Sequence, residues 1–131
     1  MKVKSFYEPV FETTVLFMTD CTPSEMKAYL KKKKYSIDVE DYSDLAGSVT
    51  FLDEEDKKGR KTREYLVVVE DKKAFYTLLH ETHHLATHIA HDRLIPIRQE
   101  NDEITAYIQN YWFRTLWRFM NNKKVTLQRT K

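Results

Sequence analysis

The chain has little of the residues that make cross-links and tight turns. Its 131 residues include one cysteine, two glycines and three prolines. Because Cys21 is the single cysteine, an internal disulfide and any zinc site built from several cysteines are excluded, and imidazole or carboxylate groups must supply the ligands of any metal site. With 41% hydrophobic residues and so few chain-breaking residues, we expect residues 1–131 to form one domain around one core.

Long hydrophobic runs and an excess of one charge are also lacking. No stretch approaches the roughly 20 apolar residues of a membrane helix, and the beginning, MKVKSFYEPVFE, lacks the apolar core of a signal peptide. We therefore expect a cytoplasmic protein, such as one made in a bacterial host, with no membrane partner. The 22 basic and 20 acidic side chains give a net charge of +2, which does not favour nucleic acid as a partner.

The hydrophobic patterning predicts an α+β domain. Three segments rich in β-branched and apolar residues predict strands, the last two joined as an antiparallel hairpin: residues 13–19, 47–53 and 64–70. Helical patterns cover residues 23 to about 34, 72–91 and 102–120. The first of these helices begins with a capping box from Thr22 to Glu25, and the second has Asp71 as its expected N-cap. We expect a small, mostly antiparallel sheet of about three strands, packed on the last two helices.

The most informative motif is His80-Glu81-Thr82-His83-His84, a complete HExxH. On a helix of roughly 100° per residue, His84 lies about 40° around the axis from His80 and one turn along it. Both imidazoles can therefore bind one zinc ion. Glu81 lies beside them, where it is poorly placed to be a third ligand. It is well placed to accept a proton from a metal-bound water, which is the general-base position of a metallopeptidase.

A catalytic zinc site normally has three protein ligands and one open position, so a third ligand is needed. His88 and His91 lie too far along the helix axis from the pair, and His83 points about 100° away from the second ligand. The remaining candidates are carboxylates of the next segment: Asp92, Glu100, Asp102 and Glu103. We favour Glu103, because Tyr107 follows it one turn later on the same face and a crossing helix would present both groups together.

HExxH followed after about twenty residues by Glu103-Ile104-Thr105-Ala106-Tyr107, a Glu-x-x-Ala-Tyr sequence, resembles the small phage-type metallopeptidases of the gluzincin group, called minigluzincins. The resemblance covers mainly residues 65–112 and implies a zincin-like fold whose edge strand lies along the cleft. The Zn²⁺ ligands that it implies are His80, His84 and Glu103, with Glu81 activating the water. Many gluzincins have an acidic residue where this chain has Tyr107, which is our candidate to orient a ligand histidine or stabilise the oxyanion.

The leading prediction is a zinc-dependent metallopeptidase that hydrolyses peptide bonds in a peptide or protein substrate. Glu81 is its expected general base and then donates the proton to the leaving amine. One alternative is a non-catalytic, zinc-stabilised interaction module of a phage or mobile element, although a purely structural site has no need of Glu81. Another is nucleic-acid binding through basic residues within 57–63 and 123–131. The substrate and the oligomeric state are not specified by the sequence.

Overall fold

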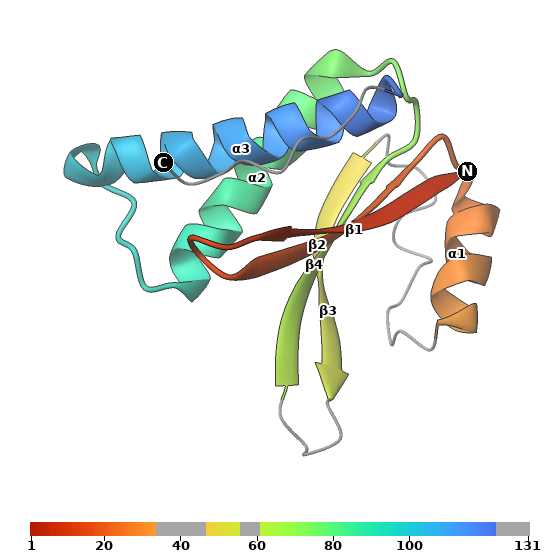
Figure 1. Ribbon diagram of the computed structural model, residues 1–131, viewed down its shortest axis with the longest axis horizontal. Helices are drawn as coiled ribbons and strands as arrows, with labels where there is room; N and C mark the ends of the chain where they lie inside the picture. Colours follow the sequence, from red (N-terminus) through yellow and green to blue (C-terminus); the bar gives the residue numbers. More distant parts are fainter. Residues whose placement is uncertain (34–46, 56–60, 123–131) are drawn as a thin grey trace.

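The computed structural model describes residues 1–33, 47–55 and 61–122, and for residues 51–55 and 61–63 it describes the backbone only. The fold is α+β, with a mixed sheet of four strands and three α-helices among the described residues (Figure 1). The elements in chain order are β1 (Lys2–Glu8), β2 (Thr13–Thr19), α1 (Pro23–Lys32), β3 (Gly47–Glu55), β4 (Lys61–Val69), α2 (Phe75–Asp92), the 3-10 turn η2 (Gln99–Asn101) and α3 (Asp102–Met120).

The sheet has the strand order β1-β2-β4-β3. The β3–β4 hairpin is antiparallel as predicted, with Gly47 opposite Val69. The prediction of about three strands was wrong, because β1 adds a fourth strand antiparallel to β2. The central pair, β2 and β4, is parallel. Parallel pairing at the centre of a sheet buries both faces of a strand, which explains why these two segments are almost continuously apolar.

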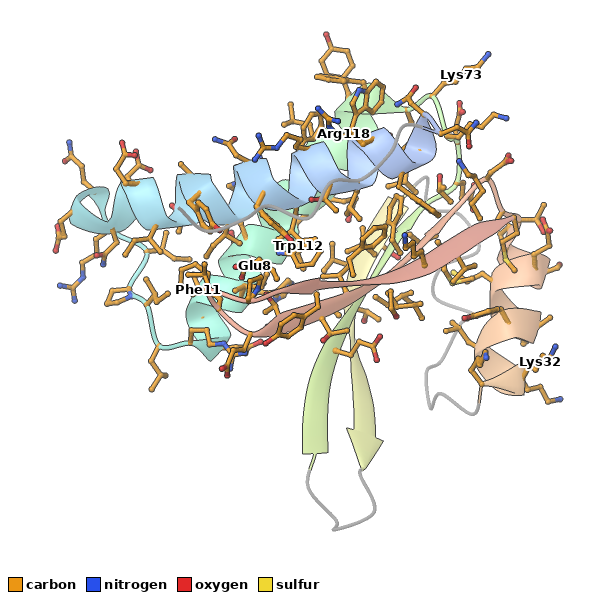
Figure 2. The ribbon with its side chains drawn as sticks, in the orientation of Figure 1. Glu8, Phe11, Lys32, Lys73, Trp112 and Arg118 are labelled. Atoms are coloured by element: carbon orange, nitrogen blue, oxygen red, sulfur yellow. The ribbon has the colours of Figure 1, made fainter. Side chains whose placement is uncertain are left out.

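The sheet separates two hydrophobic clusters. Phe17 and Val67 project into the cluster shared with α2 and α3, whereas Met18 and Leu66 project into the cluster shared with α1. Figure 1 accordingly shows α1 on one side of the sheet and α2 with α3 on the other. Cys21 is a buried free thiol in the α1 cluster. The motif helix is thus held against one face of the sheet by a core that includes Trp112 of α3 (Figure 2).

The start of α1 and the bounds of α3 agree with the sequence prediction. Thr22 and Glu25 form the predicted capping box, with the Glu25 amide donating to Thr22 Oγ1 over 3.2 Å and the Thr22 amide donating to Glu25 Oε1 over 3.0 Å. The structure assigns α1 to Pro23–Lys32, shorter than the predicted end near residue 34, which is outside the described residues. The last helix, α3, begins at Asp102 and ends at Met120, as predicted.

The prediction of Asp71 as the N-cap of the motif helix was wrong. Its carboxylate accepts a hydrogen bond from the Lys73 amide, and its carbonyl accepts one from the Ala74 amide. These two bonds close a separate turn, so that α2 begins at Phe75 with Ala74 as its N-cap. No helix among the described residues is long and apolar enough to cross a membrane.

The β1–β2 connection is fixed to the end of α2. The buried Glu8 carboxylate accepts hydrogen bonds from the Val10 and Phe11 amides, which closes the turn after β1. The Arg93 guanidinium, just beyond α2, donates to the carbonyls of Phe11 and Glu12 over 2.8 Å each. Figure 2 labels Glu8 and Phe11, two residues of this turn that take part in these bonds. The far end of the motif helix is therefore anchored to the sheet.

Candidate metal centre

The two motif histidines converge on one point. The Nε2 atoms of His80 and His84 are 3.0 Å apart, and their rings are edge-to-face with centroids 4.6 Å apart. Two imidazole nitrogens on one tetrahedral zinc ion lie about 3.3 Å apart, so a shift of a few tenths of an ångström would suit the ion. The His80 side chain is 69% exposed, and a metal can reach the pair directly from solvent. The convergence predicted from the i, i+4 spacing is confirmed.

Glu81 lies on the buried side of the His80–His84 pair. The residue is 7% exposed, and its Oε1 lies 4.0 Å from His80 Nε2. Burial raises the pKa of the Glu81 carboxyl above its ordinary value, and the neighbouring His80 and His84 act in the opposite direction. Greater proton affinity suits a carboxylate that must take a proton from water, because a general base works best when its pKa approaches the working pH.

Gly47, the first residue of β3, lets this strand approach the motif helix closely. A Cβ atom at this position would lie 2.7 Å from Thr77 Cγ2 and 3.0 Å from Glu81 Cγ. Such distances are too short for ordinary carbon contacts, so the position has room for glycine alone without local displacement. Since β3 is an edge strand, the start of one sheet edge lies directly beside Glu81.

Gly47→Ala should destabilise the protein by about 1–3 kcal/mol, because the added methyl group must displace Thr77, Glu81 or the strand. Urea unfolding monitored by tryptophan fluorescence measures this change. Ser48→Ala is the matched control: residue 48 is buried but already has a Cβ, so the substitution adds no atom, and loss of the hydroxyl should cost no more than about 1 kcal/mol. An unfolding midpoint for Gly47→Ala equal to that of the wild type would contradict the close contact between β3 and α2.

α3 lies on the other flank of the motif helix. The Phe75 ring of α2 is in edge-to-face contact with Phe113 and Trp117 of α3, with centroid distances of 5.1 and 5.2 Å. The first turn of α2 therefore packs against the second half of α3, and the two helices are roughly antiparallel. The exposed face that bears His80 and His84 is consequently flanked by β3 and by α3.

The predicted third ligand lies apart from the pair. Glu103 is exposed in the first turn of α3. Within the described residues, no group of three or more His, Cys, Asp or Glu side chains is arranged to hold a metal ion. Of the other candidates, Asp92 accepts a hydrogen bond from the Tyr65 hydroxyl of β4. Glu100 lies 3.6 Å from the Arg98 guanidinium. The structure thus brings two of the three predicted ligands together, and Glu103 as the third stays a prediction.

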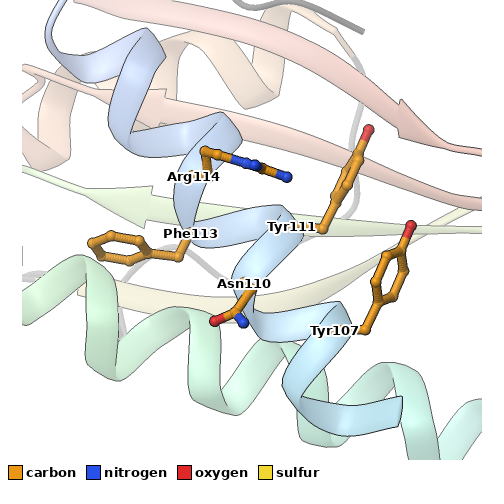
Figure 3. Close-up of a pocket in the computed structure, with 5 residues that line it drawn as sticks. All are labelled: Tyr107, Asn110, Tyr111, Phe113 and Arg114. Atoms are coloured by element: carbon orange, nitrogen blue, oxygen red, sulfur yellow. The ribbon is translucent and has the colours of Figure 1, made fainter. Parts of the chain in front are cut away.

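Tyr107 is directed toward the β1–β2 turn. Its ring lies 6.1 Å from that of Phe11 and 6.3 Å from that of Tyr111. Burial and the nearby Glu8 carboxylate raise the pKa of the Tyr107 hydroxyl, whereas Arg114 lowers it. Figure 3 shows Tyr107 and Tyr111 side by side on α3. A role for Tyr107 in orienting a ligand or stabilising an oxyanion stays a prediction.

Sequence reasoning did not identify the hollow of about 490 Å³ beside α3. The described residues that line it are Tyr107, Asn110, Tyr111, Phe113 and Arg114 (Figure 3). Tyr107, Asn110, Tyr111 and Arg114 recur at helical spacing, which can be seen in the sequence. The same spacing is typical of ordinary core packing, so it does not by itself indicate a hollow. Of the basic segments proposed for nucleic acid, residues 61–63 lie at the start of β4, whereas residues 56–60 and 123–131 are outside the described residues.

Comparisons with protein-family models, with curated proteins and with solved structures found no match for this chain. The function of this protein is therefore inferred from its own geometry. That geometry consists of two convergent imidazoles, a buried carboxylate beside them and an adjacent sheet edge.

Proposed function

We propose that this protein is a zinc-dependent metallopeptidase with a zincin-like arrangement. The observation that carries the proposal is the 3.0 Å approach of His80 Nε2 to His84 Nε2, with the Glu81 carboxylate buried beside them. Glutamate is rarely buried unless it is paired, and Glu81 is buried with the His80 imidazole 4.0 Å from its carboxylate. A hydrolytic metal site requires that combination.

The donor set is suited to zinc. His80 and His84 would bind through Nε2, and the carboxylate of Glu103 would complete a set of two imidazoles and one carboxylate, which zinc peptidases use. Glu103 makes no hydrogen bond or ion pair with another described residue, so no such interaction must be broken for its side chain to turn. When bound, the ion supplies a Lewis acid that acidifies a water molecule and polarises a peptide carbonyl.

Glu81 carries out the proton transfers. Its carboxylate removes a proton from the attacking water and then donates that proton to the nitrogen of the leaving amine as the peptide bond breaks. Its contact with the start of β3 limits the positions that its side chain can adopt, which keeps the carboxylate near the histidines. A single residue thereby acts as base and then as acid.

The edge strand β3 offers a way to bind the substrate backbone. Its only partner among the described strands is β4, and an extended peptide can add to such an edge through main-chain hydrogen bonds. Because Gly47 of β3 contacts Glu81, a peptide paired there passes close to the candidate metal centre. We therefore propose extended peptides or unfolded segments as the substrate class.

The non-catalytic zinc module remains the second candidate. The lack of an assembled three-ligand group among the described residues does not distinguish it from the peptidase, because either would need further ligands beside His80 and His84. A module that uses zinc only to brace its fold would place four protein ligands around the ion and would gain nothing from Glu81. The two candidates therefore differ in one measurable property, which is hydrolysis.

The experiment is to load the protein with zinc, measure the metal content and incubate it with a proteome-derived peptide pool. New peptide termini are identified by mass spectrometry. The peptidase predicts one zinc per chain and new termini that disappear with a chelator and return when zinc is restored. Full zinc occupancy without new termini would support the interaction module instead.

A further inference from the structure

The hollow beside α3 has the size and the chemistry of a site for a small molecule. Its volume of about 490 Å³ lies within the roughly 300–1,000 Å³ of such sites. The described residues that line it provide three aromatic rings, one amide and one guanidinium: Tyr107, Tyr111, Phe113, Asn110 and Arg114. Neither a residue of the HExxH motif nor an acidic side chain is among them. These groups suit an anion that carries an aromatic ring.

Arg114 supplies the positive charge of the hollow. It is exposed and forms no hydrogen bond or ion pair with another described residue, so its donors are available to a ligand. Figure 3 shows its side chain extending toward Tyr111, with Tyr107 beyond. Burial and the Glu8 carboxylate raise the pKa of both tyrosine hydroxyls, and Arg114 acts in the opposite direction on both. A planar guanidinium pairs with two oxygens of a carboxylate or phosphate group.

The nearby Glu8 carboxylate is already engaged. Glu8 is 1% exposed, and its two oxygens accept hydrogen bonds from the Val10 and Phe11 amides. Its charge is therefore satisfied within the β1–β2 turn, and the charge that a ligand meets from solvent is that of Arg114.

The aromatic rings of the hollow are held in place by contacts of their own. Those of Tyr107 and Tyr111 have centroids 6.3 Å apart at an interplanar angle of 33°, and the Tyr111 hydroxyl donates to the Tyr7 carbonyl over 3.3 Å. Phe113 extends away from these two rings in Figure 3 and stacks on Trp117 at an interplanar angle of 7°. Little side-chain freedom is therefore lost when a ligand enters.

We propose that this hollow binds a small aromatic anion, whose carboxylate or phosphate group pairs with Arg114 and whose ring packs against Tyr107. An aromatic contact of this kind adds to the burial of apolar area. Carboxylate and phosphate share the oxygen geometry that a guanidinium recognises. The site is independent of the proposed peptidase function, because the described residues that line the hollow include no residue of the HExxH motif.

The test is an NMR titration of the full chain, with and without zinc, using phenyl phosphate, benzoate and inorganic phosphate as probes. Shifts of the amide signals of residues 107–114 locate the binding, and their concentration dependence gives the dissociation constants. We expect at least one aromatic probe to bind with the same affinity in both metal states. Inorganic phosphate should bind about tenfold more weakly, because it lacks the ring. The tighter of the two aromatic probes identifies the anionic group.

Arg114→Gln should weaken binding of the aromatic probe by about tenfold or more, because it removes hydrogen bonds to a charged group. Arg118→Gln is the matched control and should leave the affinity unchanged, since Arg118 is exposed one turn later on α3 and is not among the described residues that line the hollow. Tyr107→Ala should bring the affinity for the aromatic probe close to that for inorganic phosphate.

The proposal is overturned if neither aromatic probe binds or if inorganic phosphate binds as tightly as they do. Equal weakening by Arg114→Gln and Arg118→Gln would also overturn it, because the anion would then respond only to general positive charge. Binding that requires zinc would place the anion on the metal instead of in the hollow, with the same consequence.

Discussion

Glu81→Gln should retain one zinc per chain and lose hydrolysis by about 10²- to 10⁴-fold in kcat. Glutamine has nearly the same shape and fits the buried position, but its neutral amide cannot remove a proton from water. Because burial already disfavours the charged carboxylate, the substitution should not lower the melting temperature. The measurement is kcat on a peptide identified as a substrate, together with metal analysis of the same samples.

Glu100→Gln is the matched control for this result. It makes the same chemical change at an exposed position of η2, where it also removes the carboxylate of an alternative candidate ligand. We expect unchanged kcat and unchanged zinc content. Full activity of Glu81→Gln would refute the general-base assignment, and loss of zinc from Glu100→Gln would show that the third ligand has been assigned to the wrong glutamate.

His84→Ala should abolish stoichiometric zinc binding and with it the stabilisation that zinc provides. For the wild type, zinc at about 100 times its dissociation constant should add about 2.7 kcal/mol to the free energy of unfolding. Because the His84 side chain is exposed, the metal-free variant should differ from the metal-free wild type by no more than about 0.5 kcal/mol. Thermal unfolding with and without zinc, combined with metal analysis, measures both quantities.

His83→Ala provides the comparison, since the adjacent His83 is also exposed but its ring centroid is 6.0 Å from that of His84, compared with 4.6 Å between His80 and His84. This variant should bind zinc and gain the same stabilisation as the wild type. Stoichiometric zinc in His84→Ala, or its loss in His83→Ala, would contradict the ligand assignment.

The features that the sequence predicted well depend on neighbours within one or two helical turns. The convergence of His80 and His84 follows from helix geometry, and the Thr22–Glu25 capping box involves residues three apart. The bounds of α3 were also predicted, because its apolar period continues from Asp102 to Met120. Asp71 was assigned wrongly because its side chain can close a turn as readily as it can cap a helix.

The remaining features depend on contacts between distant segments. Nothing local in residues 2–8 specifies pairing with β2, and the parallel pairing of β2 with β4 joins segments separated by α1 and β3. The close contact of Gly47 with Glu81 likewise exists only in the folded chain. The position of Glu103 relative to the pair depends on how α3 packs and on the charge of a bound ion. A sequence pattern encodes neither of these.

The most direct test of the account is a crystal structure of the zinc-loaded protein. The account predicts one ion bound by His80 Nε2, His84 Nε2 and the Glu103 carboxylate, with the fourth position open toward Glu81. A fourth protein ligand in that position, or a zinc ion bound without Glu103, would contradict it.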